Sequence, residues 1–443
     1  MGGRDIKGIK SKRIKIYPMD SPVEGIYFPG GDKSISHRGI FLSSLTTGKT
    51  ILENYSKCLD VSSTISVFEK LGVKFKREGN LLLIESNGIS SFTLKRDSLF
   101  CGNSGTTARL LMGALSPSHV KDIFITGDDS LSKRPMERVI KPLKMMGASI
   151  EGSEGTLPVK LTGSKINGIQ YEMEVPSAQV KSAILLASLF ASSKSVIREK
   201  FLTREHTENL LLNMGVNIKK KNLEIEIFPV KENLMSFKYL KIPGDISSAS
   251  YFIALSLLKK GSHLTVKNIT LDRGRIGFLK VLKRMGAKIL IEVVEAFPCP
   301  VGDVSVWYSN LKGTKVFSHE IPQMIDEIPI LSLLMAKSEG RSVIMGLSEL
   351  KYKESDRLRA IYEILRKLGV KVKINRDSLE IVGPSDFEGI YLKSFDHRIL
   401  MMGGIVGAIS KNGGIIEDAN FVDISYPNFF KDLASFKVVK LEV

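Results

Sequence analysis

The sequence predicts an α/β protein made of six similar units, which form two three-unit domains around buried helices. Three observations predict this fold class: a recurring helix–glycine–strand pattern, a second series of apolar helices, and a spare N-terminal segment with strand-like stretches. The 443 residues correspond to about three average domains or two large ones. A chain of this length buries a large core without disulfides or a structural metal.

The first observation is a glycine that follows an amphipathic helix and leads directly into a strand. Glycine at this position can take the left-handed conformation that ends a helix. The pattern recurs at intervals of 68 to 83 residues, at Gly72, Gly147, Gly215, Gly286 and Gly369. A degenerate sixth copy has Phe436 where the glycine would stand. Such regular spacing is typical of repeat architecture, so six units account for nearly the whole chain.

The second observation is a series of helices that are apolar over most of their circumference but begin with polar residues. Such helices are buried. A helix N-terminus carries partial positive charge and free N–H groups, so it attracts anions. Ordinary N-capping also explains polar starts, but capping does not require the Lys and Arg residues found at several of them. The expected helices are 34–45, 104–115, 177–191, 246–258, 326–336 and 396–409.

The third observation concerns strands at the two ends of the sequence. Two strands usually follow each glycine, but the last unit has only one. The strand-like segment 13–30 precedes the first unit, and we expect it to supply the missing strand. Splitting the units evenly gives one domain over 32–244 and a discontinuous domain over 1–31 and 245–443. Two similar halves predict a ligand cleft between them.

The composition excludes several classes of protein. Hydrophobic residues at 43% and charged residues at 25% are ordinary values for a globular chain. Three scattered cysteines do not form a disulfide framework or a zinc site, and no apolar run approaches the roughly 18 residues of a membrane helix. The basic N-terminus lacks the apolar core of a secretory signal. We therefore expect a soluble cytoplasmic protein.

The net charge of +17 is compatible with nucleic-acid binding, with an anionic small substrate, or with a lysine-rich solvated surface. Proteins that bind single strands interleave basic and aromatic residues. Here aromatic residues make up 7% of the chain and there is one Trp. This composition disfavours nucleic acid and leaves the other two interpretations open.

Charge and small polar residues concentrate in four stretches. In the first, Lys33 and Ser34 begin a helix, and Arg38 follows on the same face. In the fourth, Lys353 lies four residues before Arg357, so the two side chains would share one helical face. A helix is predicted over 354–368, which overlaps this stretch. A surface ion-pair network explains that fourth stretch equally well. The stretches are 29–38, 102–109, 127–138 and 353–357.

These residues resemble the 5-enolpyruvylshikimate-3-phosphate synthase family along nearly the whole chain. The motifs GDKSISHR, GNSGTTARL, KRPMERV, PSAQVKSA, IDEIP, KESDRL and DHR occur in the family's order. The resemblance implies two domains of three βαβαββ units each. It also implies transfer of the enolpyruvyl group of phosphoenolpyruvate to the 5-hydroxyl of shikimate 3-phosphate, with release of phosphate. That reaction belongs to aromatic amino-acid biosynthesis, needs no metal or organic cofactor, and is inhibited by glyphosate.

The resemblance also assigns site residues, motif by motif. It implies proton-transfer roles for Asp326 and Glu354, with Lys33 as a further candidate, and these roles could be exchanged. The residues implied for shikimate 3-phosphate are Lys33, Ser34, Arg38, Ser177, Ala178, Gln179, Arg204, Asp326 and Lys353. Those implied for phosphoenolpyruvate are Lys33, Gly105, Arg134, Gln179, Arg357 and Arg398.

The sequence departs from part of the family at two positions. Ala178 stands where some members have a second serine, so one phosphate contact is lost and Arg204 is a candidate to compensate. Ile424 stands where some members place a lysine near phosphoenolpyruvate.

The nearest alternative is the related enolpyruvyl transferase that acts on UDP-N-acetylglucosamine. That enzyme has a cysteine in the region corresponding to GDDSLSKRP, and none is present here. A second alternative is a non-enzymatic basic repeat protein that binds nucleic acid or another protein. We expect a monomeric enzyme that binds small-molecule substrates and neither nucleic acid nor membranes.

Overall fold

The computed structural model describes residues 12–92, 98–152, 155–230, 234, 236–436 and 440–442. The chain divides into two units. Unit 1 comprises Met1–Pro29, Gly244–Val294 and Val301–Val443, and unit 2 comprises Gly30–Pro243 and Glu295–Pro300. The chain therefore passes from one unit to the other after Pro29 and again after Pro243.

Unit 2 contains three four-stranded sheets within the described residues, with strand orders β14-β3-β5-β4, β6-β7-β9-β8 and β10-β11-β13-β12. The helices, in chain order, are α1 (Lys33–Leu45), α2 (Leu59–Lys70), η2 (Ile89–Ser91), α3 (Gly105–Leu115), η3 (Leu131–Lys133), α4 (Glu137–Met145), α5 (Ala178–Ser188) and α6 (His206–Asn213). The strands are β3 (Thr47–Glu53), β4 (Lys74–Glu78), β5 (Leu81–Asn87), β6 (Ser98–Phe100), β7 (Ile123–Thr126), β8 (Ser149–Gly152), β9 (Val159–Thr162), β10 (Gln170–Glu172), β11 (Ser195–Arg198), β12 (Ile218–Lys221), β13 (Glu224–Ile227) and β14 (Tyr239–Lys241).

Unit 1 repeats this plan in the part of the chain that is described, with strand orders β16-β17-β15-β2, β18-β19-β21-β20 and β22-β23-β1-β24. The helices are α7 (Ile246–Leu258), α8 (Gly277–Arg284), η4 (Ile321–Gln323), α9 (Ile328–Lys337), η5 (Ser348–Tyr352), α10 (Arg357–Lys367), α11 (His397–Ile409), η6 (Ala419–Ile424) and α12 (Phe429–Ser435). The strands are β1 (Ile14–Ile16), β2 (Glu24–Tyr27), β15 (His263–Thr270), β16 (Lys288–Glu295), β17 (Val301–Trp307), β18 (Lys315–Val316), β19 (Gly340–Ile344), β20 (Lys371–Asn375), β21 (Ser378–Gly383), β22 (Ile390–Lys393), β23 (Gly414–Glu417) and β24 (Leu441–Glu442).

The sheets share one topology, which β6 to β9 illustrate. Strands β6 and β7 are parallel, whereas β9 lies antiparallel to both β7 and β8. The antiparallel pair is the two-strand segment that follows each glycine in the sequence. The parallel pair needs a crossover, and a helix supplies it, as expected for parallel strands.

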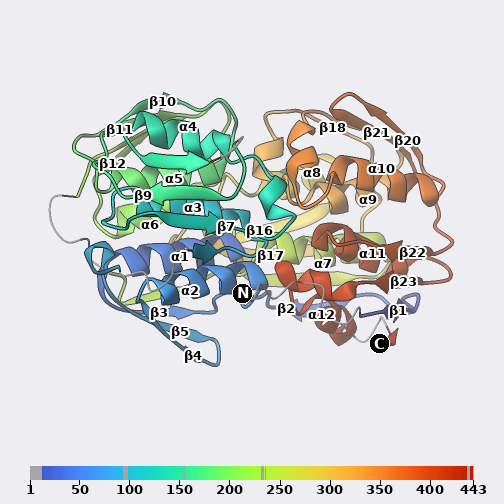
Figure 1. The fold of residues 1–443 in the computed structure, drawn as a ribbon. Coiled ribbons are helices and arrows are strands. Elements are labelled where there is room, and N and C mark those ends of the chain that lie inside the picture. Colours follow the sequence, from blue (N-terminus) through green and yellow to red (C-terminus); the bar gives the residue numbers. More distant parts are fainter. Residues whose placement is uncertain are drawn as a thin grey trace. The chain divides into compact units, whose positions relative to one another are not determined.

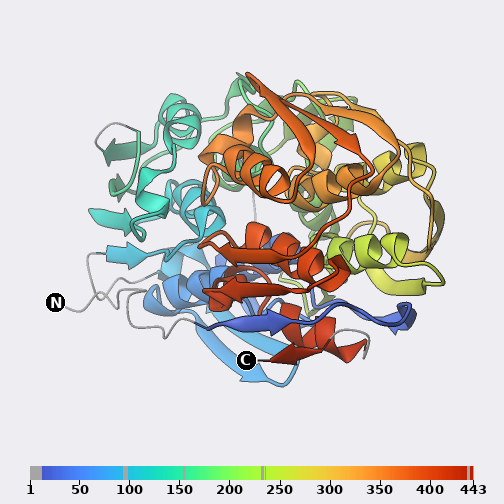
Figure 2. The same ribbon diagram turned by 90° about the vertical axis from the view of Figure 1, so that its right-hand side faces the viewer.

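The N-terminal strand completes the last sheet of the chain, as the sequence predicted. Strand β1 pairs antiparallel with both β23 and β24. Figure 2 shows this strand, in dark blue, running beside the red strands from the end of the chain. Strand β2 joins a different sheet of the same unit, where it pairs in parallel with β15.

The five glycines predicted to end helices do so. Their φ angles lie between 77° and 99°, the left-handed region in which a side chain is strained. In the degenerate sixth copy, Phe436 ends α12 with a right-handed φ of −69°. The helix–glycine–strand interpretation is therefore confirmed at five positions, and at the sixth the helix ends without the left-handed turn.

The six apolar helices form the interior of the two units. In unit 2, α3 packs against α1 and α5, and Figure 1 shows these three helices stacked between the sheets. In unit 1, α7, α9 and α11 pack against one another. Nearly every residue of α7 and α11 is buried. Helices that are apolar all round are stable only when they are enclosed in this way.

Two helices begin two or three residues later than the sequence predicted. The helix expected over 354–368 begins at Arg357, because Asp356 caps it by accepting a hydrogen bond from the backbone N of Arg359 at 3.0 Å. The helix expected over 326–336 begins at Ile328. Helix α4, which follows Pro135, begins at Glu137. Several predicted site residues therefore lie on the segments just before helices.

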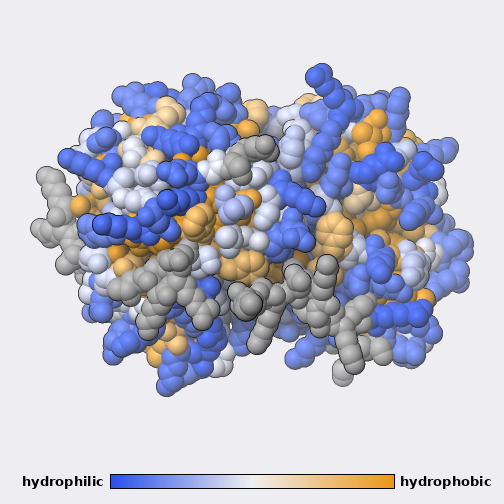
Figure 3. Space-filling view, in the orientation of Figure 1, coloured by the Kyte–Doolittle hydropathy of each residue, from blue (hydrophilic) through white to orange (hydrophobic). Residues whose placement is uncertain are grey.

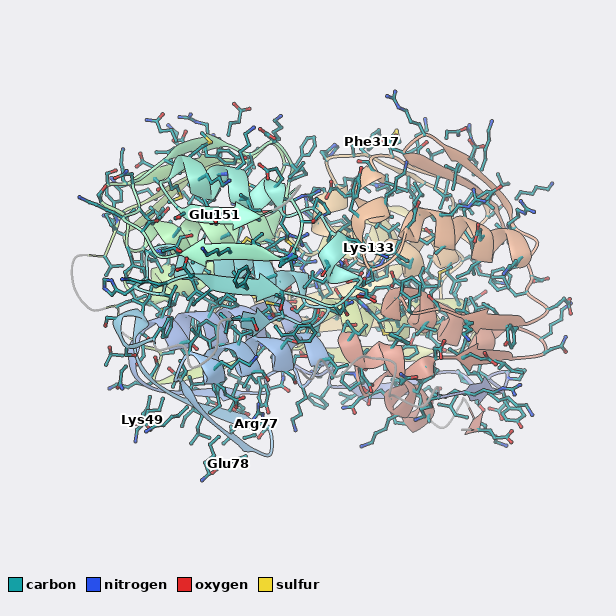
Figure 4. The ribbon with its side chains drawn as sticks, in the orientation of Figure 1. Lys49, Arg77, Glu78, Lys133, Glu151 and Phe317 are labelled. Carbon is teal, nitrogen blue, oxygen red and sulfur yellow. The ribbon has the colours of Figure 1, made fainter. Side chains whose placement is uncertain are left out.

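Many of the cations that produce the positive net charge lie in solvent. Figure 4 shows Lys49, Arg77 and Glu78 pointing away from the strands β3 and β4, and the Lys49 side chain is 80% exposed. The face drawn in Figure 3 is predominantly hydrophilic, with small apolar areas scattered over it. None of the described helices has the length and the apolar character needed to cross a membrane.

Candidate active site

Unit 2 places three helix starts among the predicted site residues, and all three are capped. Asp32 accepts a hydrogen bond from the backbone N of Ile35 at 2.8 Å at the start of α1. Ser104 and Ser177 serve as the caps of α3 and α5. N-capping thus explains these polar residues, as the sequence analysis allowed. The caps also fix where the next residues lie, because Lys33, Gly105 and Ala178 are the first residues of the three helices.

The cationic residues of α1 have well-defined partners. The Nζ of Lys33 lies 2.8 Å from Oδ2 of Asp60, on α2. Arg38 is buried and donates from Nε to Oγ1 of Thr207 at 2.7 Å and from Nη2 to Oγ of Ser182 at 2.8 Å. Its Nη1 donates to the backbone oxygen of Ser34 at 2.9 Å. These hydroxyl and carbonyl acceptors hold the guanidinium in place beside Ser34.

Arg204 reaches the same helix from a distant part of the sequence. It lies in the loop between β11 and α6, and its Nη1 donates to Oγ of Ser34 at 2.9 Å. The structure therefore brings Ser34, Arg38 and Arg204 together at the start of α1. All three were assigned to one ligand by resemblance alone.

The start of α3 is surrounded by two further arginines. Arg109 donates from Nη1 to Oε1 of Gln179 at 2.7 Å, which links α3 to α5. Arg134 donates to Oδ1 of Asn103 at 2.6 Å; it follows η3, on which Figure 4 labels Lys133. A Cβ on Gly105 would lie 2.9 Å from Nη1 of Arg109 and 3.5 Å from Nη1 of Arg134. The absence of a side chain at Gly105 thus leaves room for both guanidinium groups.

Unit 1 places acidic residues before all three of its buried helices. Asp245 precedes α7, Glu327 precedes α9 and Asp396 precedes α11. A fully buried arginine, Arg275, joins two of them: Nη1 lies 3.2 Å from Oε1 of Glu327, and Nη2 lies 3.4 Å from Oδ1 of Asp245. Its Nη2 also donates to Oγ of Ser247 at 2.6 Å. The ion pair between Arg275 and Glu327 holds the residue that directly follows Asp326.

Arg357 lies at the centre of the predicted residues of unit 1. It is buried, and its Nε donates to Oδ2 of Asp396 at 2.9 Å. Its Nη1 lies 3.5 Å from Oδ1 of Asp326, and its Nη2 pairs with Oε2 of Glu354. Burial lowers the pKa of Arg357, but the carboxylates of Asp396, Glu354 and Asp326 outweigh this effect and raise the pKa above its ordinary value.

Lys353 and Arg398 complete the group in unit 1. The Nζ of Lys353 lies 3.7 Å from Oδ1 of Asp326, and both side chains are partly exposed. Arg398 is buried in the first turn of α11, where its backbone N donates to Oδ1 of Asp396 at 2.9 Å. Burial lowers the pKa of Arg398, yet neighbouring groups, among them Tyr251 and Asp326, raise it above its ordinary value.

The prediction that Lys353 and Arg357 share one helical face is wrong. Lys353 follows η5, and Glu354 lies in the bend between η5 and α10. The ion pair of Glu354 with Arg357 nevertheless forms, because the bend folds back onto the first turn of α10. The alternative of a surface ion-pair network does not fit either, since Arg357 is buried.

Sequence reasoning missed several residues that hold the predicted ones. Asp396 and Arg109 stand inside the recognised motifs DHR and GNSGTTARL, and their positions at the start of buried helices were a usable signal. Asp60 and Thr207 have no such signal, because their partners in α1 lie 27 and 169 residues away.

One group among the described residues has the atoms of a metal site. Glu354, Asp396 and His397 place potential ligand atoms within 4.8 Å of one another. Glu354 and Asp396 already bind the guanidinium of Arg357, so a metal ion there would face a buried positive charge. The group therefore fits a cation site poorly.

Comparisons with known proteins identify the family to which the chain belongs. The model of the EPSP synthase (3-phosphoshikimate 1-carboxyvinyltransferase) family matches residues 19–433. The chain belongs to the EPSP synthase family. It is therefore an enolpyruvyl transferase of the shikimate pathway, and the alternative that acts on UDP-N-acetylglucosamine is not favoured.

Individual members of the EPSP synthase family match almost end to end. The 3-phosphoshikimate 1-carboxyvinyltransferase of Oceanobacillus iheyensis is 39% identical, over 95% of this chain and 99% of its own. That of Thermodesulfovibrio yellowstonii is 41% identical, over 92% of this chain and 96% of its own.

Solved structures give the same picture for the fold. EPSP synthase from Acinetobacter baumannii has a TM-score of 0.84 and 33% identity, with 97% of this chain and 100% of that chain covered. The enolpyruvyl transferase NikO from Streptomyces tendae shares the fold, with a TM-score of 0.78 over 98% of both chains at 15% identity. The predicted fold of three repeated units in each half is thereby confirmed.

Proposed function

We propose that the chain transfers the enolpyruvyl group of phosphoenolpyruvate to the 5-hydroxyl of shikimate 3-phosphate and releases phosphate. The observation that carries this proposal is the cluster in unit 1, where Asp326 and Glu354 both lie on the guanidinium of Arg357. The reaction needs an anion-binding group with proton-transferring carboxylates beside it, and this cluster combines the two.

The residues proposed for shikimate 3-phosphate come from both units. In unit 2, the contacts of Arg38 and Arg204 with Ser34 support a phosphate site, since a fork of N–H donors matches phosphate oxygens. The start of α5 adds backbone N–H groups, which attract an anion. The proposed ligands are Lys33, Ser34, Arg38, Ser177, Ala178, Gln179 and Arg204 of unit 2, and Asp326 and Lys353 of unit 1.

Phosphoenolpyruvate carries a carboxylate and a phosphate, so several guanidinium groups suit it. Two hydrogen bonds support a role for Gln179, because they fix its amide against α3: Oε1 accepts from Arg109 at 2.7 Å and Nε2 donates to Oγ1 of Thr106 at 2.8 Å. The proposed ligands are Lys33, Gly105, Arg134 and Gln179 of unit 2, and Arg357 and Arg398 of unit 1.

The proposed chemistry is addition followed by elimination. The 5-hydroxyl oxygen bonds to C2 of phosphoenolpyruvate while Asp326 accepts its proton and Glu354 delivers a proton to C3. The tetrahedral intermediate then returns the C3 proton to Glu354 and expels phosphate. Lys33 is the third candidate for proton transfer. Each positioned proton transfer accelerates such a step by about 10²- to 10⁴-fold.

The test is phosphate release by the purified chain with shikimate 3-phosphate and phosphoenolpyruvate, without added metal. A parallel reaction contains UDP-N-acetylglucosamine in place of shikimate 3-phosphate. We expect release only in the first reaction. Release that requires the nucleotide sugar would overturn the proposal.

We further propose that the enzyme is a cytoplasmic monomer, that glyphosate inhibits it, and that residues 32–244 and residues 1–31 with 245–443 are its two domains. Sedimentation at several protein concentrations tests whether the enzyme is a monomer. Inhibition in competition with phosphoenolpyruvate tests the statement on glyphosate.

A further inference from the structure

Unit 2 contains a cluster of three buried charges that the proposed reaction does not use. The Nζ of Lys181, on α5, lies 2.9 Å from Oε2 of Glu199 and 2.7 Å from Oε1 of Glu208. The exposed fractions of the three side chains are 0%, 2% and 0%. Burial of charge is costly, and an apolar replacement of similar volume is often as stable. A role beyond stability is therefore worth testing.

The first link between this cluster and the proposed shikimate 3-phosphate ligands is the loop that carries Arg204. Thr203, which is buried, donates from Oγ1 to Oε1 of Glu199 at 2.5 Å. Glu199 therefore holds the residue directly before Arg204. On the other side of the loop, Glu205 lies 2.6 Å from Nζ of Lys220.

The second link is the pair of hydroxyls that holds Arg38. Ser182 and Thr207 are 2.7 Å apart, and both accept hydrogen bonds from Arg38. Ser182 follows Lys181 on α5, and Thr207 precedes Glu208 on α6. The ion pair between Lys181 and Glu208 thus joins the two helices directly beside the acceptors of Arg38.

We propose that Lys181, Glu199 and Glu208 are positioning residues for shikimate 3-phosphate. They fix the Arg204 loop and the Arg38 acceptors against α5, whose first turn carries Ala178 and Gln179. This inference rests on the proposed assignment of Arg38 and Arg204 to that substrate. It predicts that loosening the cluster weakens shikimate 3-phosphate binding and leaves turnover and phosphoenolpyruvate binding nearly unchanged.

The decisive variant is Thr203→Val, which removes one hydroxyl, keeps the shape of the side chain and leaves the charges of the cluster intact. We expect the KM for shikimate 3-phosphate to rise about 5- to 20-fold, which is part of the roughly 10- to 150-fold that one hydrogen bond to a charged group is worth. The kcat and the KM for phosphoenolpyruvate should stay within about twofold of the parent enzyme. Thr203→Ser keeps the hydroxyl and should restore the parent KM.

Ser188→Ala is the matched control, because Ser188 is buried near the other end of α5 and bonds Ser195 there. It should lower the Tm about as much as Thr203→Val without changing either KM. A lowered Tm with an unchanged KM in Thr203→Val would overturn the positioning role. Lys181→Met leaves two buried carboxylates without the ammonium group that pairs with them, so this variant is expected to unfold and cannot replace the test.

Arg204→Met separates the failure of this inference from the failure of the proposed assignment. If Arg204→Met raises the KM for shikimate 3-phosphate and Thr203→Val does not, the assignment stands and the positioning role is wrong. If neither variant changes that KM, Arg204 does not bind this substrate, and the positioning inference is wrong with it.

Discussion

The Nε of Arg357, the first residue of α10, donates a hydrogen bond to Oδ2 of Asp396, the residue that caps α11, at 2.9 Å. The other oxygen of Asp396 caps α11 and accepts from the backbone N of Arg398. A single carboxylate therefore sets the positions of two arginines that are proposed to bind phosphoenolpyruvate.

Asp396→Asn should weaken phosphoenolpyruvate binding more than shikimate 3-phosphate binding. Asn keeps one oxygen for the cap, but its amide N–H₂ then faces Nε of Arg357 and repels it. We expect the KM for phosphoenolpyruvate to rise about 10-fold or more, as a broken buried pair costs several kcal/mol. Asp356→Asn, which preserves the exposed cap of α10, is the control and should leave both KM values unchanged. Equal effects on the two substrates would contradict the prediction.

Glu354→Gln should separate proton transfer from binding. The amide keeps the shape of the side chain but cannot carry the proton to and from C3. We expect kcat to fall by about 10²- to 10⁴-fold, while the Kd of shikimate 3-phosphate stays within about threefold. Lys353→Met should give the opposite pattern, with weaker binding of that substrate. Near-normal turnover of Glu354→Gln would assign the C3 proton to another residue.

Gly105→Ala should reduce inhibition by glyphosate. The added methyl would lie 2.9 Å from Nη1 of Arg109, so the guanidinium must move, and Arg109 holds Gln179. We expect the ratio of glyphosate Ki to phosphoenolpyruvate KM to rise, with a smaller rise in the KM itself.

Gly369→Ala controls for stability, because φ at Gly369 is +77° and the cost there is about 1–2 kcal/mol of backbone strain. It should lower the Tm without changing the inhibition ratio. A Gly105→Ala enzyme with a lower Tm and the parent ratio would show that this glycine serves only the turn into α3.

His37 should make the enzyme less stable below about pH 6.5. Burial, with the charges of Lys33 and Arg38, lowers the pKa of this histidine well below its ordinary value. The unfolded chain therefore binds a proton that the folded chain does not, so its contribution to stability is present above pH 6.5 and is lost as the pH falls. The loss is about 1.4 kcal/mol per pH unit below that value.

Urea unfolding at pH 7.5 and pH 5.5 measures the contribution of His37. His37→Gln can keep the hydrogen bond that Nδ1 shares with Thr64 and should lose about 1 kcal/mol less than the parent between the two pH values. His119→Gln replaces an exposed histidine, and this variant should lose as much stability between the two pH values as the parent. Equal losses in all three proteins would mean that His37 takes up no extra proton on unfolding.

The sequence alone was sufficient for the repeats because their signals are local. A glycine after an amphipathic helix and an apolar helix with a polar start each reflect a few neighbouring residues. The contacts of the site are different, since Arg204 and Ser34 are 170 residues apart. Only the packed fold brings such pairs together.

The resemblance named site residues that local patterns did not, but it could not supply their partners. Asp60 and Thr207 hold Lys33 and Arg38 from neighbouring helices and carry no motif of their own. The start of α10 was misjudged for a related reason: either Glu354 or Asp356 could begin the helix, and the choice depends on the fold around Arg357.

The place of β1 between β23 and β24 affects the order in which the chain can fold during synthesis. Ribosomes add roughly 5–20 residues per second, so the partners of β1, some 400 positions later, emerge about 20–80 seconds after it. Most of unit 2 is a continuous segment and can form in that interval. The last sheet of unit 1 must wait for β24, so removal of β24 should leave β1 with an unpaired edge that promotes aggregation.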